Sequence, residues 1–380
     1  MKLFYCKKCL TTNLRPNASF EDGVCIACRY SGGSGSEKSK KLRQLTCMIR
    51  ERRKYHIKHP VYDCIVGVSG GKDSTRQAHW VRDRLGMNPL LVCVAYPPKQ
   101  MSDTGAKNVS NLIELGFDIL IATPAPGSSR DLSLESFVKF GNVCKSTELA
   151  LFSTVPRIAI ELGIQDIFWG ENPALQVGDS SVAGLNEFDG NNLRNLNTLK
   201  EGGNDWIKHA LVNPLNGFHY VYPTEIEFNK KYINIYYLGA AWDDWSTLDN
   251  STYAALQGLT LRPGEESSTG DISNASMLDE EFTNINMMIK YYKYGFGRAT
   301  DQVCEMIRDG KITRDQGIEL VQRYDGVCSD VIIKKYCEYV NISVEHFWKE
   351  THRWVNWDIF EYRGTVRPIP KFQVGADYAG

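Results

Sequence analysis

Residues 62–74 of the chain read YDCIVGVSGGKDS. Residues 63–68 are a short apolar run rich in valine and isoleucine, which predicts a buried strand. From residue 73 to residue 85 the pattern becomes helical, and it ends at Gly86, a suitable C-terminal cap. A strand that passes through a glycine turn into a helix directs free backbone N–H groups and the positive end of the helix dipole at one point. The stretch therefore predicts an anion site.

The turn itself is built for close contact with that anion. Gly70 and Gly71 allow the main chain to curl tightly, while Ser69, Lys72 and Ser74 add donors. The spacing is not that of a Walker A loop, because the stretch has one residue too few between the first glycine and the Gly-Lys pair. We interpret it as a phosphate or pyrophosphate cradle. The plain alternative is a strand–turn–helix connection that binds nothing.

Composition limits the class of protein. The 380 residues include 44 Lys and Arg against 45 Asp and Glu, so the net charge of −1 gives no global attraction to nucleic acid or to an anionic membrane. No apolar run approaches the ~20 residues of a membrane span, and the first residues lack the apolar region of a signal peptide. We expect a cytoplasmic protein whose eleven cysteines are reduced.

Four of these cysteines form two CxxC pairs separated by fifteen residues. They are Cys6, Cys9, Cys25 and Cys28. This spacing can place four thiolates around Zn²⁺ at ~2.3 Å, which predicts a zinc ribbon over residues 1–30. Four protein ligands leave no open position, so the zinc is expected to be structural. The alternative is four reduced thiols without metal.

A linker and a basic helix are expected over residues 31–60. Residues 31–36, SGGSGS, are typical of a flexible linker. Residues 37–58 carry nine Lys or Arg against two Glu. The apolar residues available for one helical face are Leu42, Leu45, Ile49 and Tyr55. A basic helix can bind RNA phosphates, but we favour a solvated helix that packs on the next domain.

Strands and helices alternate over residues 61–245. The expected strands are 63–68, 89–94, 117–122 and 166–169, and the expected helices are 73–85, 106–115, 132–140 and 147–162. This alternation predicts an α/β domain with a parallel sheet and helices on both faces. Such sheets bind ligands at the carboxyl ends of their strands.

Polar residues follow the fourth strand at that edge. Residues 168–172 read FWGEN. Glu171 is a candidate to hold Mg²⁺ or to orient a substrate. Asn172 is a candidate to form a hydrogen bond with that substrate. A cap of a helix or turn is the alternative role for Glu171.

The middle of the chain is less regular. Residues 174–213 lack periodicity, which is typical of a functional lid or a mobile loop. Residues 224–238 favour β-structure and lead into GAAWDDW at 239–245. Trp242 and Asp243 suit sugar recognition, and the alternative is a core tryptophan beside a surface aspartate.

The remainder, residues 246–380, is mainly helical in pattern. A helix expected over 280–294 leads into KYGFGRATD at 293–301. Arg298 is a candidate to neutralise charge developing on pyrophosphate. A structural pair between Arg298 and Asp301 is the alternative.

Together these stretches resemble the N-acetyl sugar amidotransferase family (WbpG- and PseA-type enzymes) of the PP-loop ATP pyrophosphatase superfamily. The resemblance rests on the CxxC pairs, residues 62–74, residues 168–172 and residues 295–301. It departs at the Gly-Ser tract, where the family usually runs charged and helical. It implies an adenine-nucleotide alpha-hydrolase-like sheet over residues 61–245.

The resemblance also implies a reaction: ATP-dependent conversion of a sugar acetamido group into an acetamidino group, through an adenylated imidate that ammonia attacks. Such sugars belong to bacterial surface glycans such as lipopolysaccharide O-antigen. The implied ATP-binding residues are Val68, Ser69, Gly70, Gly71, Lys72, Asp73, Ser74 and Gly170. The implied catalytic residues are Lys72, Asp73, Glu171 and Arg298. The implied substrate contacts are Glu171, Asn172, Trp242 and Asp243. The implied cofactors are ATP and Mg²⁺, with Asp73 as a candidate metal contact, beside the structural Zn²⁺ expected from the cysteine spacing.

The source of ammonia is not apparent in this chain, because the sequence has no Gly-x-Cys-x-Gly elbow typical of a glutaminase nucleophile. The resemblance implies two partners, a glutaminase subunit and an ammonia-channelling cyclase-like subunit (HisH-like and HisF-like). Three other classes stay open: a PP-loop enzyme that thiolates tRNA, a nucleotide-binding scaffold subunit, and a sulfonucleotide reductase.

Overall fold

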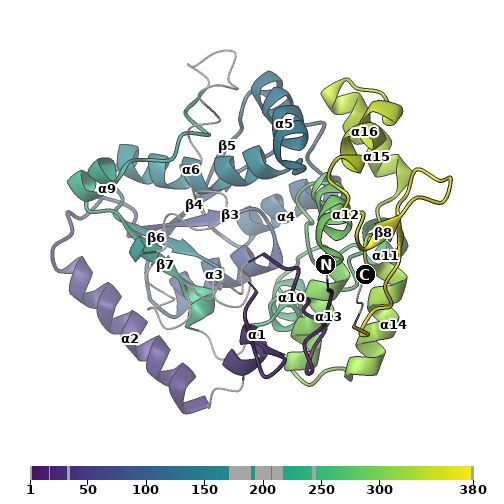
Figure 1. Ribbon diagram of the computed structural model, residues 1–380. Helices are drawn as coiled ribbons and strands as arrows, with labels where there is room; N and C mark the ends of the chain where they lie inside the picture. The colour runs from purple at the N-terminus through teal and green to yellow at the C-terminus, as the bar shows by residue number, and fades with distance from the viewer. Residues whose placement is uncertain are drawn as a thin grey trace.

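A five-stranded parallel sheet forms the centre of the molecule (Figure 1). The computed structural model describes residues 2–16, 18–31, 35–170, 190–192, 207, 217–241 and 245–377. The strands are β3 (Cys64–Val68), β4 (Pro89–Val94), β5 (Ile119–Ala122), β6 (Asp166–Trp169) and β7 (Asn234–Tyr237). Their order is β5-β4-β3-β6-β7, and every neighbouring pair is parallel. The predicted parallel sheet is confirmed.

Helices cover both faces of the sheet, because each central strand is apolar on both sides. One face packs against α2 (Gly35–Arg53), α3 (Lys72–Asp83) and α4 (Asp103–Glu114). The other packs against α6 (Lys145–Leu162) and α9 (Glu225–Lys231), while α5 (Pro126–Phe140) lies beside α6. Successive residues of β3 point to opposite faces of the sheet: Val66 packs on the first face and Ile65 on the second.

The order of the strands places a switch point between β3 and β6. The chain builds outward from β3 to β4 and β5, then returns to add β6 and β7 on the other side. Ligands of open α/β sheets bind at the carboxyl ends of the two strands that flank such a point. Gly67 keeps these two strands close, since a Cβ atom there would lie 2.3 Å from the ring of Trp169. The loops after Val68 and Trp169 therefore meet at one edge.

The basic helix packs on the sheet, as favoured from the sequence. Its Leu45 and Ile49 are buried against the sheet. Arg53 near its end pairs with Asp63, 2.5 Å away. Tyr55 lies beyond the end of α2 and is 84% exposed, so it does not extend the apolar face as expected.

The segment 224–238 forms a strand only in its second half. Its first half is α9, which begins with a reciprocal cap: the Thr224 side chain accepts from the Glu227 amide, and the Glu227 carboxylate accepts from the Thr224 amide. The helix ends at Lys231, and Tyr232 caps it with a φ of 54°. Capping at the first residues thus outweighs the β propensity of this segment. Two short 3₁₀ turns, η1 (Gly190–Asn192) and η4 (Leu238–Ala240), lie beside β7 and after it.

The C-terminal region is helical, as predicted. It contains α10 (Thr247–Leu256), α11 (Glu266–Thr269), α12 (Thr283–Tyr294), α13 (Arg298–Arg308), α14 (Arg314–Tyr324), α15 (Asp330–Val340) and α16 (Val344–His352). A small hairpin of β8 (Phe360–Glu361) and β9 (Ile369–Pro370) follows. One face of α12, which carries Ile285, Ile289 and Tyr292, is buried in the core of this region. Within the part of the chain that the structure describes, no helix has the length and apolar character to cross a membrane.

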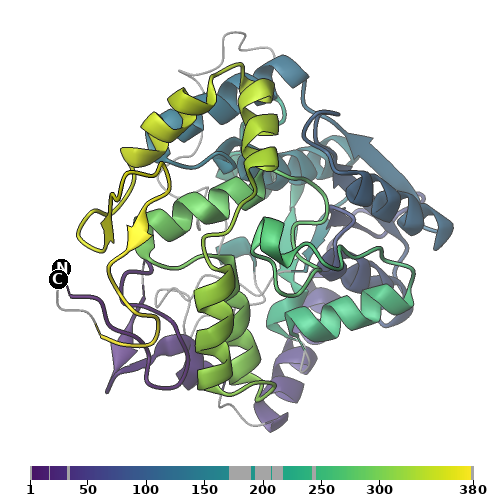
Figure 2. The ribbon, with the colours of Figure 1, turned by 90° about the vertical axis from the view of Figure 1, so that its right-hand side faces the viewer.

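The N-terminal module packs against this C-terminal region rather than standing apart. The module has a hairpin of β1 (Phe20–Glu21) and β2 (Val24–Cys25), then α1 (Ile26–Tyr30). Figure 2 shows it beside the green helices α13 and α14. Leu3 and Leu10 are fully buried in a core shared with these helices. The two ends of the sequence therefore form one packed unit.

Candidate active site

The glycine turn after β3 has the geometry expected of a cradle. Gly70 has a φ of 80°, and a Cβ atom there would lie 3.0 Å from the Val109 side chain of α4. Helix α3 begins at Lys72, with Gly71 as its N-terminal cap. The Ser74 hydroxyl donates to the Gly71 carbonyl oxygen over 3.1 Å, so it closes the turn. The free amides of the first turn of α3 are thus available to an anion.

Lys72 and Asp73 are held together beside this turn. The Lys72 Nζ atom lies 2.8 Å from Asp73 Oδ2. The other carboxylate oxygen of Asp73 accepts a hydrogen bond of 2.6 Å from Asn250 Nδ2, on α10. Asn250 Oδ1 in turn accepts from Arg76, also over 2.6 Å. Asn250 is therefore a positioning residue that the sequence reasoning missed, and nothing in its sequence context indicates this contact.

Gly170 joins the same edge from β6. A Cβ atom there would lie 3.3 Å from the backbone oxygen of Asp73. One turn along α3, Gln77 donates to the carbonyl oxygen of Gly67 over 2.9 Å, which fixes the helix against the strand. The structure thus brings Gly170 to the glycine turn, as expected. The candidates Glu171, Asn172, Trp242 and Asp243 lie outside the described residues.

Two neighbouring acidic residues of the C-terminal region are buried or half-buried, and the first of them approaches the turn. Asp279 accepts a hydrogen bond of 2.9 Å from the Tyr96 hydroxyl, and burial raises its pKa although hydrogen bonds from Tyr96 and Ser69 oppose this. Burial and the neighbouring charge of Asp279 raise the pKa of Glu280 to about 7. Asp279 therefore lies within reach of Ser69, a contact that the sequence reasoning did not find.

A third acid, Glu305 on α13, is hydrogen-bonded to the first residue of α10. Its carboxylate accepts from the Thr247 amide and, over 2.7 Å, from the Thr247 hydroxyl. Burial raises the pKa of Glu305, while the positive charge of nearby Lys72 lowers it. Asp279 and Glu305 thus bring acidic groups of the C-terminal region toward the candidate site.

Arg298, the remaining catalytic candidate, is the first residue of α13. Asp301 does not pair with it directly: Arg15 Nη1 lies 2.6 Å from Asp301 Oδ1, and Lys290 Nζ lies 2.6 Å from Asp301 Oδ2. Arg298 affects Asp301 only through its charge, which helps to lower the pKa of that carboxyl against the effect of burial. The Arg298–Asp301 ion pair weighed as the structural alternative is not formed.

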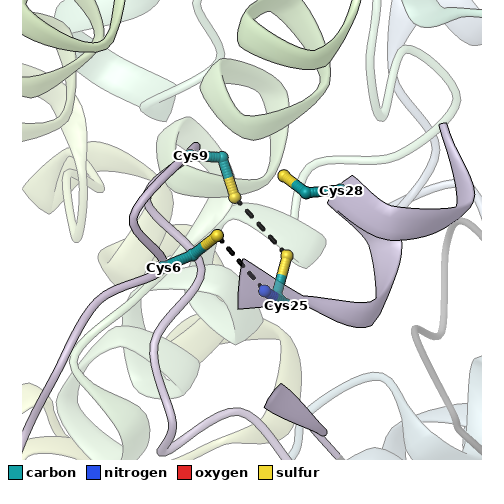
Figure 3. A group of neighbouring side chains, drawn as sticks. All are labelled: Cys6, Cys9, Cys25 and Cys28. Atoms are coloured by element: carbon teal, nitrogen blue, oxygen red, sulfur yellow. Dashed lines mark hydrogen bonds between the residues drawn. The ribbon is translucent and has the colours of Figure 1, made fainter. Parts of the chain in front are cut away.

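The four cysteines of the N-terminal module form a candidate metal site (Figure 3). All four are buried, and their sulfur atoms lie within 4.8 Å of one another. Ligands ~2.3 Å from a tetrahedral zinc are about 3.8 Å apart, and Cys9 Sγ lies 3.7 Å from Cys25 Sγ. Backbone amides of Lys8 and Cys25 donate to Cys6 Sγ over 3.4 and 3.3 Å. The arrangement fits a zinc held by four thiolates.

Helix α13 connects these features along one face. Arg298, Asp301, Glu305 and Arg308 follow one another at three- and four-residue spacing, which places them on one side of a helix. Arg308 lies close enough to the cysteine cluster for thiolate charge to raise its pKa against burial. Helix α13 thus carries a residue near the candidate metal site, the partner of Arg15 and the acceptor of the Thr247 hydroxyl.

Comparison with known protein families gives a match within the C-terminal region. Residues 276–372 match the family model described as "LPS biosynthesis protein WbpG-like, C-terminal domain". The chain carries a WbpG-like C-terminal domain. This match confirms the WbpG-type resemblance, and the matched residues include Asp279, Arg298 and Glu305. No curated protein matches the chain.

Proposed function

We propose that the protein is an ATP-dependent amidotransferase that converts the acetamido group of a sugar into an acetamidino group. The observation that carries the proposal is the glycine turn at the switch point of the parallel sheet, in a chain with a WbpG-like C-terminal domain. The turn supplies a site for the phosphates of ATP. The family description supports a role in the synthesis of bacterial lipopolysaccharide.

The chemistry requires a leaving group on the amide carbon. In the proposed reaction the acetamido oxygen attacks the α-phosphorus of ATP, and pyrophosphate leaves into the turn at residues 69–74. Ammonia then attacks the imidate carbon, the C–O bond to AMP breaks, and the nitrogen loses a proton. Lys72 and the amides that open α3 stabilise charge on the departing pyrophosphate.

Asp73 is the residue of the turn with the right ligand chemistry for Mg²⁺, since this ion binds nucleotide phosphates together with one or two carboxylates. When bound, Mg²⁺ would neutralise phosphate charge. In the structure the two oxygens of Asp73 contact Lys72 and Asn250, so its carboxylate is already oriented beside the turn. Its side chain is 31% exposed, which leaves access for a metal–nucleotide complex.

Ammonia is proposed to come from a separate glutaminase subunit through a cyclase-like partner, because this sequence has no glutaminase elbow. Co-purification of the three chains and glutamine-dependent turnover test this step. Full activity of the lone chain with glutamine would contradict it.

The main experiment is mass spectrometry of diacetamido sugars, free or nucleotide-linked, incubated with the full chain, ATP, Mg²⁺ and ammonium. The expected product shows exchange of one oxygen for NH, with AMP and pyrophosphate formed in equal amounts. Lys72→Ala should abolish the exchange. If transfer RNA, and no sugar, stimulates pyrophosphate release, the alternative of a tRNA-modifying PP-loop enzyme is correct instead.

A further inference from the structure

The two edges of the central sheet are finished differently. At the β7 edge the 3₁₀ turn η1 lies against the strand, and Asn191 Oδ1 accepts a hydrogen bond of 3.0 Å from the Ile235 amide. The approach is close, because a Cβ atom on Gly190 would lie 2.4 Å from the Ile235 side chain. An outward-facing amide of β7 is thus satisfied within the chain. The turn also occupies the place where a further strand would add to this edge.

β5 forms the other edge, and its single strand neighbour among the described residues is β4. The carbonyl oxygens of Asp118 and Ala122 each accept a hydrogen bond of 2.9 Å from an amide on the β4 side. Because residues of a strand alternate in the direction of their backbone hydrogen bonds, Leu120 also bonds toward β4. The N–H and C=O groups of Ile119 and Ile121 point outward. Within the described part of the chain, no element pairs with them.

The side chains of β5 are apolar on both faces of the sheet. Ile119 packs on the face covered by α2, α3 and α4, and Ala122 packs on the opposite face. Since successive side chains alternate, Ile121 shares the face of Ile119, and Leu120 shares that of Ala122. Leu120 is 36% exposed and Ile121 is 52% exposed. Proteins usually protect an open edge with charged side chains, proline or a covering element, and β5 has none of these along its four residues. The edge therefore fits another apolar strand.

A second copy of the chain supplies such a strand through its own β5. A two-fold axis perpendicular to the sheet relates the two strands in antiparallel fashion and makes the contact self-complementary. Opposed residues of antiparallel strands exchange both of their hydrogen bonds when their polar groups point at each other. Ile119 of each copy then pairs with Ile121 of the other. This register is centred on Leu120, which lies opposite the same residue of the second copy.

The charge next to β5 is compatible with this register. Asp118, directly before the strand, comes opposite Ala122 of the other copy, so the two carboxylates do not face each other. Like charges directly opposite each other would destabilise the pair. Asp118 also accepts a hydrogen bond of 3.1 Å from the Tyr62 hydroxyl of its own copy. The self-paired edge thus joins apolar side chains and free backbone groups without opposing charges.

We propose that two copies of the chain associate through β5 and form one continuous sheet. Because the paired strands run antiparallel, the carboxyl edges of the two sheets point in opposite directions. The two glycine turns therefore lie on opposite sides of the dimer, and a partner at one turn does not block the other. The inference concerns assembly and does not depend on the proposed reaction.

The molar mass in solution tests the proposal. The full chain is measured by analytical ultracentrifugation at several concentrations, and we expect twice the mass of one chain. Leu120→Lys and Leu120→Glu each place like charges opposite each other at the centre of the register, so each variant alone should show half the parent mass. A mixture of the two variants should associate more tightly than either variant alone, because opposite charges then face each other. Ile226→Lys is the matched control, since Ile226 is an exposed isoleucine on α9, and it should leave the dimer intact.

Hydrogen exchange of the unmodified chain gives a second readout that requires no substitution. The outward amides of Ile119 and Ile121 should exchange slowly at high protein concentration and rapidly after dilution. Rapid exchange at all concentrations would contradict the pairing, as would a monomeric parent or a dimer that Leu120→Lys leaves intact. A dimer that Ile226→Lys also dissociates has its interface elsewhere, and the proposal is wrong. If the mixed variants associate no better than each alone, the register centred on Leu120 is refuted.

Discussion

Replacing Asn250 by alanine should slow pyrophosphate release from ATP without unfolding the protein. Asn250 donates over 2.6 Å to Asp73 and accepts over 2.6 Å from Arg76, so the change frees the Asp73 carboxylate beside the glycine turn. A hydrogen bond to a charged group contributes about 1.5–3 kcal/mol. If the hydrogen bond to Asp73 stabilises the transition state by this full amount, its loss lowers the rate of pyrophosphate release roughly 10- to 150-fold.

Asn111→Ala is the matched control for this prediction. Asn111 donates over 2.9 Å to the carbonyl oxygen of Gln257, just after α10, so its loss loosens the same helix without touching Asp73. Pyrophosphate release is measured with a coupled assay at saturating ATP, and thermal unfolding is measured in parallel. We expect Asn111→Ala to lower the melting temperature while keeping the rate near that of the parent. Equal rates for Asn250→Ala and the parent would refute the assigned role of Asn250.

Three further predictions concern the sheet, the buried acids and the metal site. Gly67→Ala should destabilise the protein by about 1–3 kcal/mol in chemical denaturation, because the added Cβ atom would overlap the indole ring of Trp169 on β6. Gly127→Ala is the control and should not destabilise the protein, because the space around Gly127 is open. The pKa of Glu280 is raised to about 7 in the folded state, so the free energy of unfolding should fall by up to about 3 kcal/mol as pH rises from roughly 4.5 to 7. Glu280→Gln should remove this pH dependence of the free energy of unfolding. An unchanged pH dependence would show that another group causes it. Cys9→Ser should abolish stoichiometric zinc and increase hydrogen exchange in α13, while Cys47→Ser, at an exposed cysteine, should retain the metal.

The sheet could be predicted closely because its strands are short apolar runs between clear turns. The expected strands 89–94 and 166–169 agree with β4 and β6 at both ends, and 63–68 differs from β3 by one residue. The structure of segment 224–238 was harder to predict, because its tyrosine and isoleucine residues favour strands while its first residues form a capped helix. The pattern of Thr224 followed three residues later by Glu227 is the signal that indicates this helix.

The contacts around the glycine turn could not be predicted in the same way. Asn250 and Glu305 lie outside the expected PP-loop domain, and nothing local in the sequence distinguishes them from surface residues of a helix. Their position depends on tertiary packing, because α10 packs against α3 and Glu305 of α13 accepts a hydrogen bond from Thr247 at the start of α10. The grouping of the four cysteines, by contrast, was predictable, since the spacing of two CxxC pairs is typical of a metal site.

The packing of the N-terminal module has a consequence for biosynthesis. The Thr11 hydroxyl contacts Cys304 Sγ, a partner 293 positions later in the chain. A ribosome that adds 5–20 residues per second needs on the order of 15–60 s to reach that partner. During this time the nascent module exposes Leu3 and Leu10, which the finished protein buries completely. Cellular chaperones would have to shield this surface until translation ends, and messages cut short before α13 would yield chains that expose it permanently.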